Sequence, residues 1–562
     1  MNSITKKVLF ILTDSDRLKV LFLLIISFLR TILDLLSVGL IVPFLIFLFD
    51  EDKKVLILEY FPYLKQYSQN ELIVLSIIVL LIIYLFKTLI VILVNFLNER
   101  VAQNLRVEIS RKLLLKYLNN NFLFFIENNS SKLLRNISSE TMMFTHGIVV
   151  NFINFFTNSI FFIGICTGLI IYDINSIYVM GVLLLISSII IFAYNKKFYE
   201  WGIIRSIESE NFIRELNEVF GSIKEVILYN KANYYLEETL APLRKFARST
   251  IYKDSFSHTT APIIEFIGVS IFFLFLIFLI LFVKMEINSV FVLVGFLAFA
   301  SIKILPNLVA LIKSIQSFKY NIPAVENIYK DFTSRKNRKS NKMLNDIKNI
   351  KFSNVSFKYP ATKKPVLKNV NLNINKGDKV AIIGETGSGK STLLNLLSGL
   401  LLPSKGNVYS NKYNLKNYQL NIGYVSQFVY MSDKSIIKNV SLSKELNQKN
   451  KKRINEILKN LSLGKLTNIK KNKNTGERGA KISGGQIQRI GIARAIYRNP
   501  SILVLDEATN SLDAGVEEKV LKYVFSNFKN KIIILCTHKQ KLIKYCNKII
   551  EVKNNSVKIK RS

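Results

Sequence analysis

The sequence predicts two parts, an α-helical bundle that crosses a membrane six times and, after it, an α/β domain. Half of the 562 residues are hydrophobic, and a mean hydropathy of +0.27 is high for a soluble protein. The apolar excess lies before residue 320, whereas the rest of the chain alternates short apolar runs with glycines, as α/β proteins do. A chain of this length exceeds one hydrophobic core. We therefore expect a transmembrane domain over residues 1–335 and a second domain over residues 336–562.

Six apolar runs approach or exceed the roughly 20 residues that a helix needs to cross a bilayer. They cover residues 19–49, 72–97, 148–172, 177–194, 262–283 and 288–312. The segments after the second and fourth runs are rich in Lys and Arg, whereas the segment after the first carries Asp50, Glu51 and Asp52. Because cytoplasmic loops collect Lys and Arg, this asymmetry places both termini and the second domain in the cytoplasm of a multi-pass protein of the inner (plasma) membrane.

The two basic inner segments, residues 98–135 and 196–250, have a composition that favours helix throughout. We expect them to extend the spans into the cytoplasm, each with a break that suits a short transverse helix, near Asn119–Asn129 and near Tyr229–Tyr235. Long inner extensions with short outer loops are what a transporter needs if a cytoplasmic domain is to move its spans.

Ionisable residues within the predicted spans are candidates for substrate contacts, because charges are costly in a bilayer. Arg30 and Asp34 are four residues apart and can pair along one helix face. Lys87 lies in the middle of an apolar run, and Lys303 and Lys313 are nearly three turns apart on roughly one face. A basic cavity wall would suit an anionic substrate. Ion pairs between helices, or Lys stems that reach the membrane surface, are the alternative interpretation.

A phosphate-binding loop stands between a predicted buried strand, Lys379–Ile383, and a helical stretch that begins at Thr392. The glycines of such a loop let backbone N–H groups surround phosphates. Lys390 would place its charge on the β- and γ-phosphates of ATP, and the Ser391 hydroxyl would ligate Mg²⁺. The loop comprises Gly384, Glu385, Thr386, Gly387, Ser388, Gly389, Lys390 and Ser391.

A second element of the same site is the apolar run Ile502–Leu505, which predicts a strand buried on both faces. Asp506 at its end can hold Mg²⁺, and Glu507 can orient and polarise the attacking water. Together with the phosphate-binding loop, this pair predicts a nucleotide hydrolase.

A second glycine-rich helix start precedes the helical stretch Ile487–Tyr497 and consists of Ser483, Gly484, Gly485 and Gln486. Such a start is also a phosphate cradle, yet the first loop already holds the phosphates within the chain. We therefore expect this cradle to close on the nucleotide of another subunit, so that hydrolysis requires a dimer.

With these motifs in order, residues 350–553 resemble the nucleotide-binding domain of ABC transporters. The resemblance implies that Tyr359 stacks on adenine, that Gln427 reaches Mg²⁺ and senses the membrane domain, and that His538 contacts the γ-phosphate. It also identifies Ser483–Gln486 as the family signature and Ser511–Asp513, with Asp513 near the nucleotide, as the D-loop. Glu477–Gly479 resembles a stretch typical of the exporter branch. ATP and Mg²⁺ are the implied cofactors, and Glu507 and His538 are the implied catalytic pair.

The first half of the chain resembles bacterial flippases for lipid-linked oligosaccharides in Leu40–Phe44, Glu59–Glu71, Ile302–Pro306 and the surroundings of Lys87. This resemblance implies ATP-driven flipping of a polyprenyl pyrophosphate-linked oligosaccharide by a homodimer surrounded by membrane lipids. Lys87 and Lys303 stand where such flippases carry arginine. Other basic positions of the family are Ile263 and Ala310 here, which leaves a different lipid or head group open.

Other functions also stay open at this point. An exporter of another lipid, a peptide or a drug would share all the motifs. An ATPase of the same fold that works on chromosomes or ribosomes is opposed by the six predicted spans, and a non-hydrolysing regulatory partner is opposed by Glu507 and His538. The net charge of +38 is explained by cytoplasmic Lys and Arg and by a chain rich in Lys throughout. The sequence contains no nucleic-acid-binding motif, so we expect no nucleic-acid partner.

Overall fold

The computed structural model describes residues 2–39, 62–172, 176–278, 287–334, 342–360, 362–464 and 474–561. The chain forms two compact units. The first, called the helical unit, comprises Met1–Asn119 and Asn128–Lys336. The second, called the α/β unit, comprises Asn337–Ser562 together with the short segment Asn120–Glu127.

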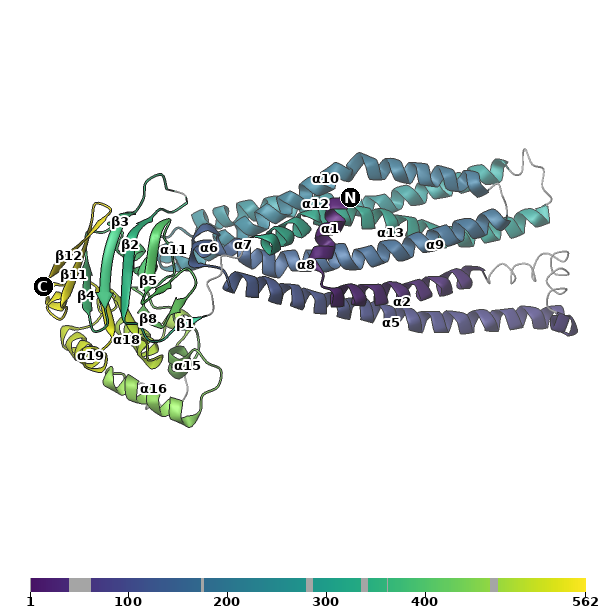
Figure 1. The fold of residues 1–562 in the computed structure, drawn as a ribbon. Helices are drawn as coiled ribbons and strands as arrows, with labels where there is room; N and C mark the ends of the chain where they lie inside the picture. The colour runs from purple at the N-terminus through teal and green to yellow at the C-terminus, as the bar shows by residue number, and fades with distance from the viewer. Residues whose placement is uncertain are drawn as a thin grey trace. The chain divides into compact units, whose positions relative to one another are not determined.

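Long helices make up the helical unit and run side by side along most of their length (Figure 1). They pack as neighbours in the pairs α2–α5, α2–α9, α9–α13, α10–α12 and α10–α13. Their bounds are α2 (Asp14–Gly39), α5 (Gln69–Leu118), α9 (Asn151–Tyr172), α10 (Ser176–Gly221), α12 (Ala232–Phe278) and α13 (Ile287–Thr333). Shorter elements are α1 (Asn2–Ile11) and η1 (Pro62–Gln66).

Each predicted span falls on one of these long helices, although residues 40–49 and 279–283 of two predicted spans lie outside the described residues. Within the part of the chain that the structure describes, four helices are long and apolar enough to cross a membrane. They are Asp14–Ser37, Asn70–Leu118, Ser130–Gly168 and Ala232–Leu274. The count of six spans therefore stays a prediction.

The predicted helical extensions are present, and each is followed by a short helix. After α5 ends at Leu118, α6 (Phe122–Glu127) occupies the first predicted break. The second short helix, α11 (Ile223–Leu228), lies before the predicted position Tyr229–Tyr235. A helix break does lie within the predicted position, because α12 begins only at Ala232, but the short helix itself precedes that position since α10 already ends at Gly221.

Between α6 and α9 the chain alternates between two kinds of helix. The α-helices α7 (Ser130–Arg135) and α8 (Thr141–Phe144) are separated by a π-helical turn, η2 (Asn136–Glu140), and a second π-helical turn, η3 (Thr145–Val150), leads into α9. A π-turn brings residues five apart onto one face. The turn η2 in this way brings Arg135 and Glu140, which form a buried ion pair, onto one face.

Two sheets with helices packed around them form the α/β unit (Figure 1). The main sheet has the order β12-β11-β4-β10-β9-β8 and is parallel except for the β11–β12 hairpin. Its strands are β4 (Lys379–Ile383), β8 (Ile422–Val425), β9 (Ile502–Asp506), β10 (Ile532–Cys536), β11 (Lys548–Lys553) and β12 (Ser556–Arg561). Parallel strands end at one edge of a sheet, where ligands bind in open α/β folds.

The second sheet is antiparallel with the order β3-β2-β5-β6, and β1 pairs with β7 alone. Its strands and this pair are β2 (Asn349–Phe357), β3 (Leu367–Asn375), β5 (Lys405–Ser410), β6 (Tyr413–Asn414), β1 (Met343–Leu344) and β7 (Gln419–Leu420). The helices of this unit are α14 (Lys390–Leu397), α15 (Ile436–Ser441), α16 (Gln448–Asn460), η5 (Glu477–Gly479), α18 (Gly484–Tyr497), α19 (Ala514–Asn527) and α20 (Gln540–Ile543).

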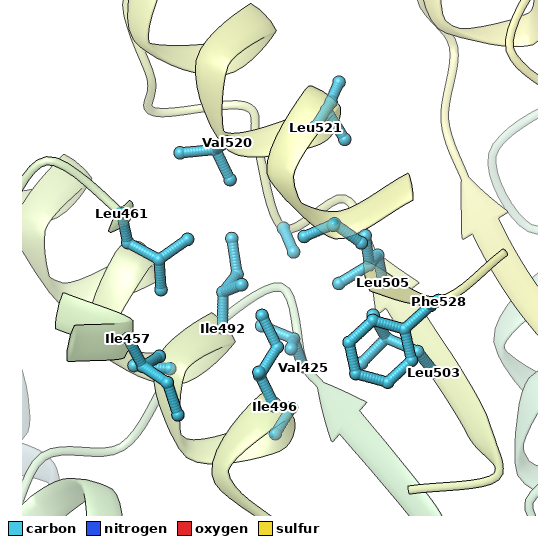
Figure 2. Packing of buried hydrophobic residues seen from close by; sticks show 14 of the residues in the cluster. Val425, Ile457, Leu461, Ile492, Ile496, Leu503, Leu505, Val520, Leu521 and Phe528 are labelled. Atoms are coloured by element: carbon cyan, nitrogen blue, oxygen red, sulfur yellow. The ribbon is translucent and has the colours of Figure 1, made fainter. Parts of the chain in front are cut away.

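Strand β9 is buried on both faces, as its apolar run predicts. Leu503 and Leu505 point into the core that Figure 2 shows, where they meet Ile492 and Ile496 of α18. Ile502 and Val504, which alternate with them, enter a second core on the opposite face. α18, whose N-cap is Ser483, and the strand that ends in Asp506 therefore share one hydrophobic core.

Candidate functional site

The predicted phosphate-binding loop lies between β4 and α14, in the strand–loop–helix context that the sequence indicates. Gly384 has no room for a side chain, since a Cβ there would lie 2.3 Å from the Val552 carbonyl oxygen. Gly389, with a φ of +106°, forms the N-cap of α14. The glycines therefore let the loop turn tightly onto the helix start.

Lys390 folds back over this loop. Its Nζ donates to the carbonyl oxygens of Gly384 at 2.7 Å and Glu385 at 2.8 Å, so the ammonium is held in the concavity of the loop. The Ser388 hydroxyl is buried and has no hydrogen-bond partner in the described residues. A cationic group, a helix N-terminus and an unsatisfied buried hydroxyl together fit the phosphates of ATP.

Tyr359 follows β2 and is tied to the same helix. Its ring packs edge-on against Phe357 at 4.8 Å, and its hydroxyl lies 3.3 Å from the hydroxyl of the buried Thr392. The structure therefore holds Tyr359 beside the helix start, and its contact with adenine stays a prediction.

Asp506 ends β9 and lies in register with Cys536 of the neighbouring strand β10. Tyr424, on β8 at the other side of β9, donates its hydroxyl to Asp506 Oδ2 at 2.9 Å. Burial, together with this carboxylate, raises the pKa of Tyr424, so its hydroxyl stays protonated and remains a donor. One carboxylate oxygen of Asp506, the predicted Mg²⁺ ligand, is therefore held by a hydrogen bond from an uncharged donor.

Glu507 is the centre of a side-chain network. Its Oε2 accepts hydrogen bonds from Gln427 Nε2 at 3.0 Å and from Asn510 Nδ2 at 2.9 Å. His538 Nε2 lies 3.7 Å from its other carboxylate oxygen. The structure thus brings together the predicted residues Gln427, Glu507 and His538 on three separate segments of the chain.

The backbone of Glu507 also has an unusual conformation. Its φ of +49° lies in the left-handed region, which costs energy for a residue with a side chain. The strain is held in place because the Glu507 N–H donates to the Cys536 carbonyl oxygen at 3.1 Å. Such a conformation turns the carboxylate away from the direction that a continued β9 strand would give it.

The second glycine-rich segment starts α18 with a capping box. Ser483 Oγ accepts from the Gln486 N–H at 3.3 Å, and Gln486 Oε1 accepts from the Ser483 N–H at 3.1 Å. Gly484 has open space where a Cβ would stand, and Asp513 is the N-cap of α19. In the described ranges no hydrogen bond or ion pair joins Ser483–Gln486 to the phosphate-binding loop. Its closure on the nucleotide of another subunit stays a prediction.

Sequence reasoning missed three residues of this region, namely Tyr424, Asn510 and Gln488. Gln488 Oε1 accepts from the Ser511 N–H at 3.0 Å and so ties α18 to the segment that precedes Asp513. Asn510 lies three residues after Glu507, a spacing that signals a local turn contact. Tyr424 gives no such signal, because only the strand order places it beside Asp506.

In the helical unit, Lys87 lies on α5 and Asp34 on α2. Their side chains form an ion pair at 2.8 Å, and Lys87 also donates to Ser37 Oγ at 3.0 Å. The expected Arg30–Asp34 pair is present at 3.6 Å. For Lys87 the contacts thus correspond to the alternative of an ion pair between helices.

Lys303 and Lys313 both lie on α13. The side chain of Lys303 lies outside the described residues, so its predicted role stays a prediction. Lys313 is half-buried and forms no ion pair or hydrogen bond with the described part of the chain.

Two family models match the chain. Residues 20–306, about half of the chain, match the ABC transporter transmembrane region. Residues 367–510 match the ABC transporter model and include the phosphate-binding loop, the α18 start and Glu507.

Curated relatives are similar over a shorter stretch. An ATP-dependent lipid A-core flippase of Wigglesworthia glossinidia brevipalpis is 34% identical over 215 residues, which cover 37% of each chain. The alpha-hemolysin translocation ATP-binding protein HlyB of Escherichia coli O157:H7 is 33% identical over 214 residues, which cover 37% of this chain and 30% of that protein. The matched segment thus spans about a third of these relatives' length.

A solved structure is similar along nearly the whole chain. The structure of a bacterial Atm1-family ABC exporter with ATP bound superposes with a TM-score of 0.77 and covers 97% of this chain and 94% of that one. The sequence identity is 15%, so this likeness concerns the fold.

Proposed function

The chain belongs to the ABC transporter family, and from this premise we propose that it is one half of an ATP-driven exporter. The helical unit carries the cargo and the α/β unit hydrolyses ATP. The observation that carries the proposal is the carboxylate of Glu507, held by Gln427 and Asn510 beside Asp506 and the His538 ring. A carboxylate fixed in this way suits the orientation of an attacking water.

Each residue of this site has its own role in ATP hydrolysis. Lys390 and the loop N–H groups bind the β- and γ-phosphates, and Glu507 accepts a proton from the attacking water. Ser391, Gln427 and Asp506 would hold Mg²⁺, which when bound supplies positive charge to the phosphate oxygens. His538, beside Glu507, donates a hydrogen bond to the γ-phosphate. These roles follow from residue type and placement in a site whose glycines and buried Ser388 hydroxyl fit a nucleotide.

A second copy of the chain completes the site. Ser483 and Gly485 of one copy would close on the phosphates bound at Gly384–Ser391 of the other. The motifs of both half-sites are intact in this chain, which favours a homodimer.

For the cargo we propose a lipid-linked saccharide, carried on a polyprenyl pyrophosphate or a similar amphipathic lipid, across the inner membrane. The likeness to relatives named lipid A-core flippase supports a glycolipid cargo.

The test uses the purified full chain in proteoliposomes with polyprenyl pyrophosphate-linked saccharide in the bilayer. We expect MgATP to remove the saccharide from the leaflet that faces the α/β unit, and Glu507→Gln to abolish both this flipping and most ATP hydrolysis. Glu518→Gln is the matched control, because Glu518 forms only an exposed pair with Lys522 at 2.9 Å. Equal, slow hydrolysis by wild type and Glu507→Gln would refute the hydrolytic role.

A second candidate cargo, another lipid, a peptide or a drug, is favoured by the likeness to the alpha-hemolysin translocation protein. The same vesicles distinguish the two. If the saccharide lipid neither moves nor stimulates ATP hydrolysis while a peptide or lipid A does, the saccharide assignment is wrong and the exporter assignment stands.

A further inference from the structure

A polar pocket lies within the helical unit, among α2, α9 and α13. It has a volume of about 330 Å³, which is the size of a small-ligand site. Its polar lining comes mainly from Arg30, Asp34, Asn154, Thr157, Asn158 and Asn307. Amides and hydroxyls thus gather where the surrounding helices are otherwise strongly apolar.

The asparagines of α9 follow a helical stripe. Asn151, Asn154 and Asn158 are three and four residues apart, so they share one face of the helix. Asn151 has a structural task, because its Nδ2 donates to the Ser314 carbonyl oxygen of α13 at 2.7 Å. The side-chain amides of Asn154 and Asn158, in contrast, form no hydrogen bond in the described part of the chain.

Asn307 of α13 completes the set from the opposite wall. Its Oδ1 is buried and accepts no hydrogen bond within the described ranges. A buried amide oxygen without a partner costs free energy. Three amides around one pocket are therefore available to a ligand that can both donate and accept hydrogen bonds.

The charges at the pocket are already engaged with one another. Asp34 pairs with Lys87 and with Arg30, and Arg30 also donates to Asn95 Oδ1 at 3.3 Å. An anion would have to compete with the Asp34 carboxylate for both cations. A neutral group rich in hydroxyls and amides has no such competitor, and it matches the free Asn amides.

The position of the pocket along the predicted spans also favours a head group. Asn154 and Asn158 lie six and ten residues after the predicted cytoplasmic start of their span at residue 148, roughly 9 to 15 Å along the helix. Asn307 lies five residues before the predicted cytoplasmic end of its span at residue 312. The pocket therefore falls in the cytoplasmic half of the predicted spans.

We propose that this pocket is a subsite for the uncharged sugar part of the cargo, which the amides of Asn154, Asn158 and Asn307 bind through its hydroxyl and N-acetyl groups. The proposal rests on the proposed function, because it assigns one part of the lipid-linked saccharide to one place in the helical unit. The anionic linkage binds elsewhere, and Asp34 with its two cations positions α2 against α5 at the pocket edge.

The experiment compares two probes, a polyprenyl pyrophosphate that carries one N-acetylhexosamine and the same lipid without sugar. Binding to the full chain in nanodiscs is measured by quenching of a fluorophore on the lipid. We expect the sugar to improve affinity about tenfold, as one to two good hydrogen bonds would. The double variant Asn158→Leu with Asn307→Leu should reduce the sugar advantage, which is the ratio of the affinities with and without the sugar, to about twofold or less. It should leave the affinity for the bare lipid, the probe without sugar, unchanged. Asn104→Leu, an exposed position on α5 outside the pocket, should keep the full advantage.

The binding results distinguish a failure of the proposed sugar subsite from a failure of the proposed flippase function. A sugar advantage that disappears only in the pocket variant supports the subsite. Equal binding of both probes by wild type, or an advantage that the pocket variant keeps, overturns the subsite and leaves the flippase function standing. Binding of neither probe overturns the proposed cargo, and the subsite with it. Unchanged ATP hydrolysis and bare-lipid binding show that the pocket variant folds. The conservative variant Asn158→Gln should restore part of the advantage.

Discussion

The hydroxyl of Tyr424 donates a hydrogen bond to Oδ2 of Asp506 at 2.9 Å. The two residues lie on neighbouring parallel strands, β8 and β9. The pKa of Tyr424 is raised by its burial and by the carboxylate, so the tyrosine donates at every physiological pH. One carboxylate oxygen of Asp506 is thus directed by the protein.

Tyr424→Phe should therefore weaken the use of Mg²⁺ without removing the site. Partners that orient a metal ligand typically contribute tenfold or more to metal affinity or activity. We expect the Mg²⁺ concentration for half-maximal ATP hydrolysis to rise about tenfold, with nearly normal activity at saturating Mg²⁺. The measurement is an Mg²⁺ titration of hydrolysis at fixed ATP. A lower maximal rate with an unchanged midpoint would contradict the role in metal binding.

Asn510 is a positioning residue for Glu507, since its Nδ2 donates to Glu507 Oε2 at 2.9 Å. Without this bond the carboxylate keeps only Gln427 as a hydrogen-bond donor from the described side chains. Asn510→Ala should lower kcat about tenfold and leave KM for ATP within about twofold, because the residue does not touch the phosphates. Asn510→Asp should lower kcat further and shift the pH profile of hydrolysis upward, because a like charge raises the pKa of a carboxylate. An unchanged pH profile would contradict direct contact with Glu507.

Most elements of the α/β site could be predicted from sequence because each is local. Gly384–Ser391 and Ser483–Gln486 each join one helix start to its own glycines, and Ile502–Leu505 is too uniformly apolar for anything but a buried strand. Tyr424 escaped prediction because its place depends on the order of the strands. Nothing near Tyr424 in the sequence shows that β8 lies beside β9.

The helical unit was harder to predict for a related reason. Apolar length identifies a span, but the rotation of one helix against another decides which side chains meet. The pair Lys87–Asp34 joins α5 to α2, and hydropathy contains no information about that contact. The free amides of Asn154 and Asn158 likewise appear in the sequence only as a stripe, whose purpose depends on what faces it.

Cys536 is the register partner of Asp506 and is almost fully buried. Burial first, and the Asp506 carboxylate second, raise the pKa of its thiol to about 12. The thiol should therefore resist iodoacetamide at pH 9, where a thiol with the ordinary pKa of 9.0 would be half ionised. Labelling is measured by mass spectrometry in a Cys166→Ser, Cys546→Ser background. Labelling as fast as in the denatured chain would contradict the burial.

The raised pKa of Cys536 also predicts how the free energy of unfolding changes with pH. The folded state favours the neutral Cys536 thiol. The stability that this preference contributes is therefore fully present below pH 9, and it is lost as the pH rises from about 9 towards 12. Cys536→Ser removes the titrating group. The variant should therefore show less loss of stability over that pH window than the background chain, measured by denaturant titration at pH 8 and pH 10.5. An identical loss in both chains would count against the raised pKa.

Glu140 is buried between two arginines of the helical unit and should contribute strongly to its stability. It lies 3.3 Å from Arg205 Nη2 and 3.7 Å from Arg135 Nε, and the π-turn η2 brings the latter partner, five residues away, onto its face. Glu140→Gln leaves the buried Arg205 without its carboxylate partner, whereas Arg135 keeps its ion pair with Glu210 at 2.7 Å. We therefore expect a loss of about 3 kcal/mol in the free energy of unfolding. Glu237→Gln makes the same exchange in an exposed pair with Arg244 and should cost less than about 1 kcal/mol. Unfolding in detergent is followed by SDS titration of both variants. Equal, small losses would show that the buried cluster contributes no more than a surface pair, whereas a large loss for Glu140→Gln alone would establish it as the electrostatic support of the helices around η2.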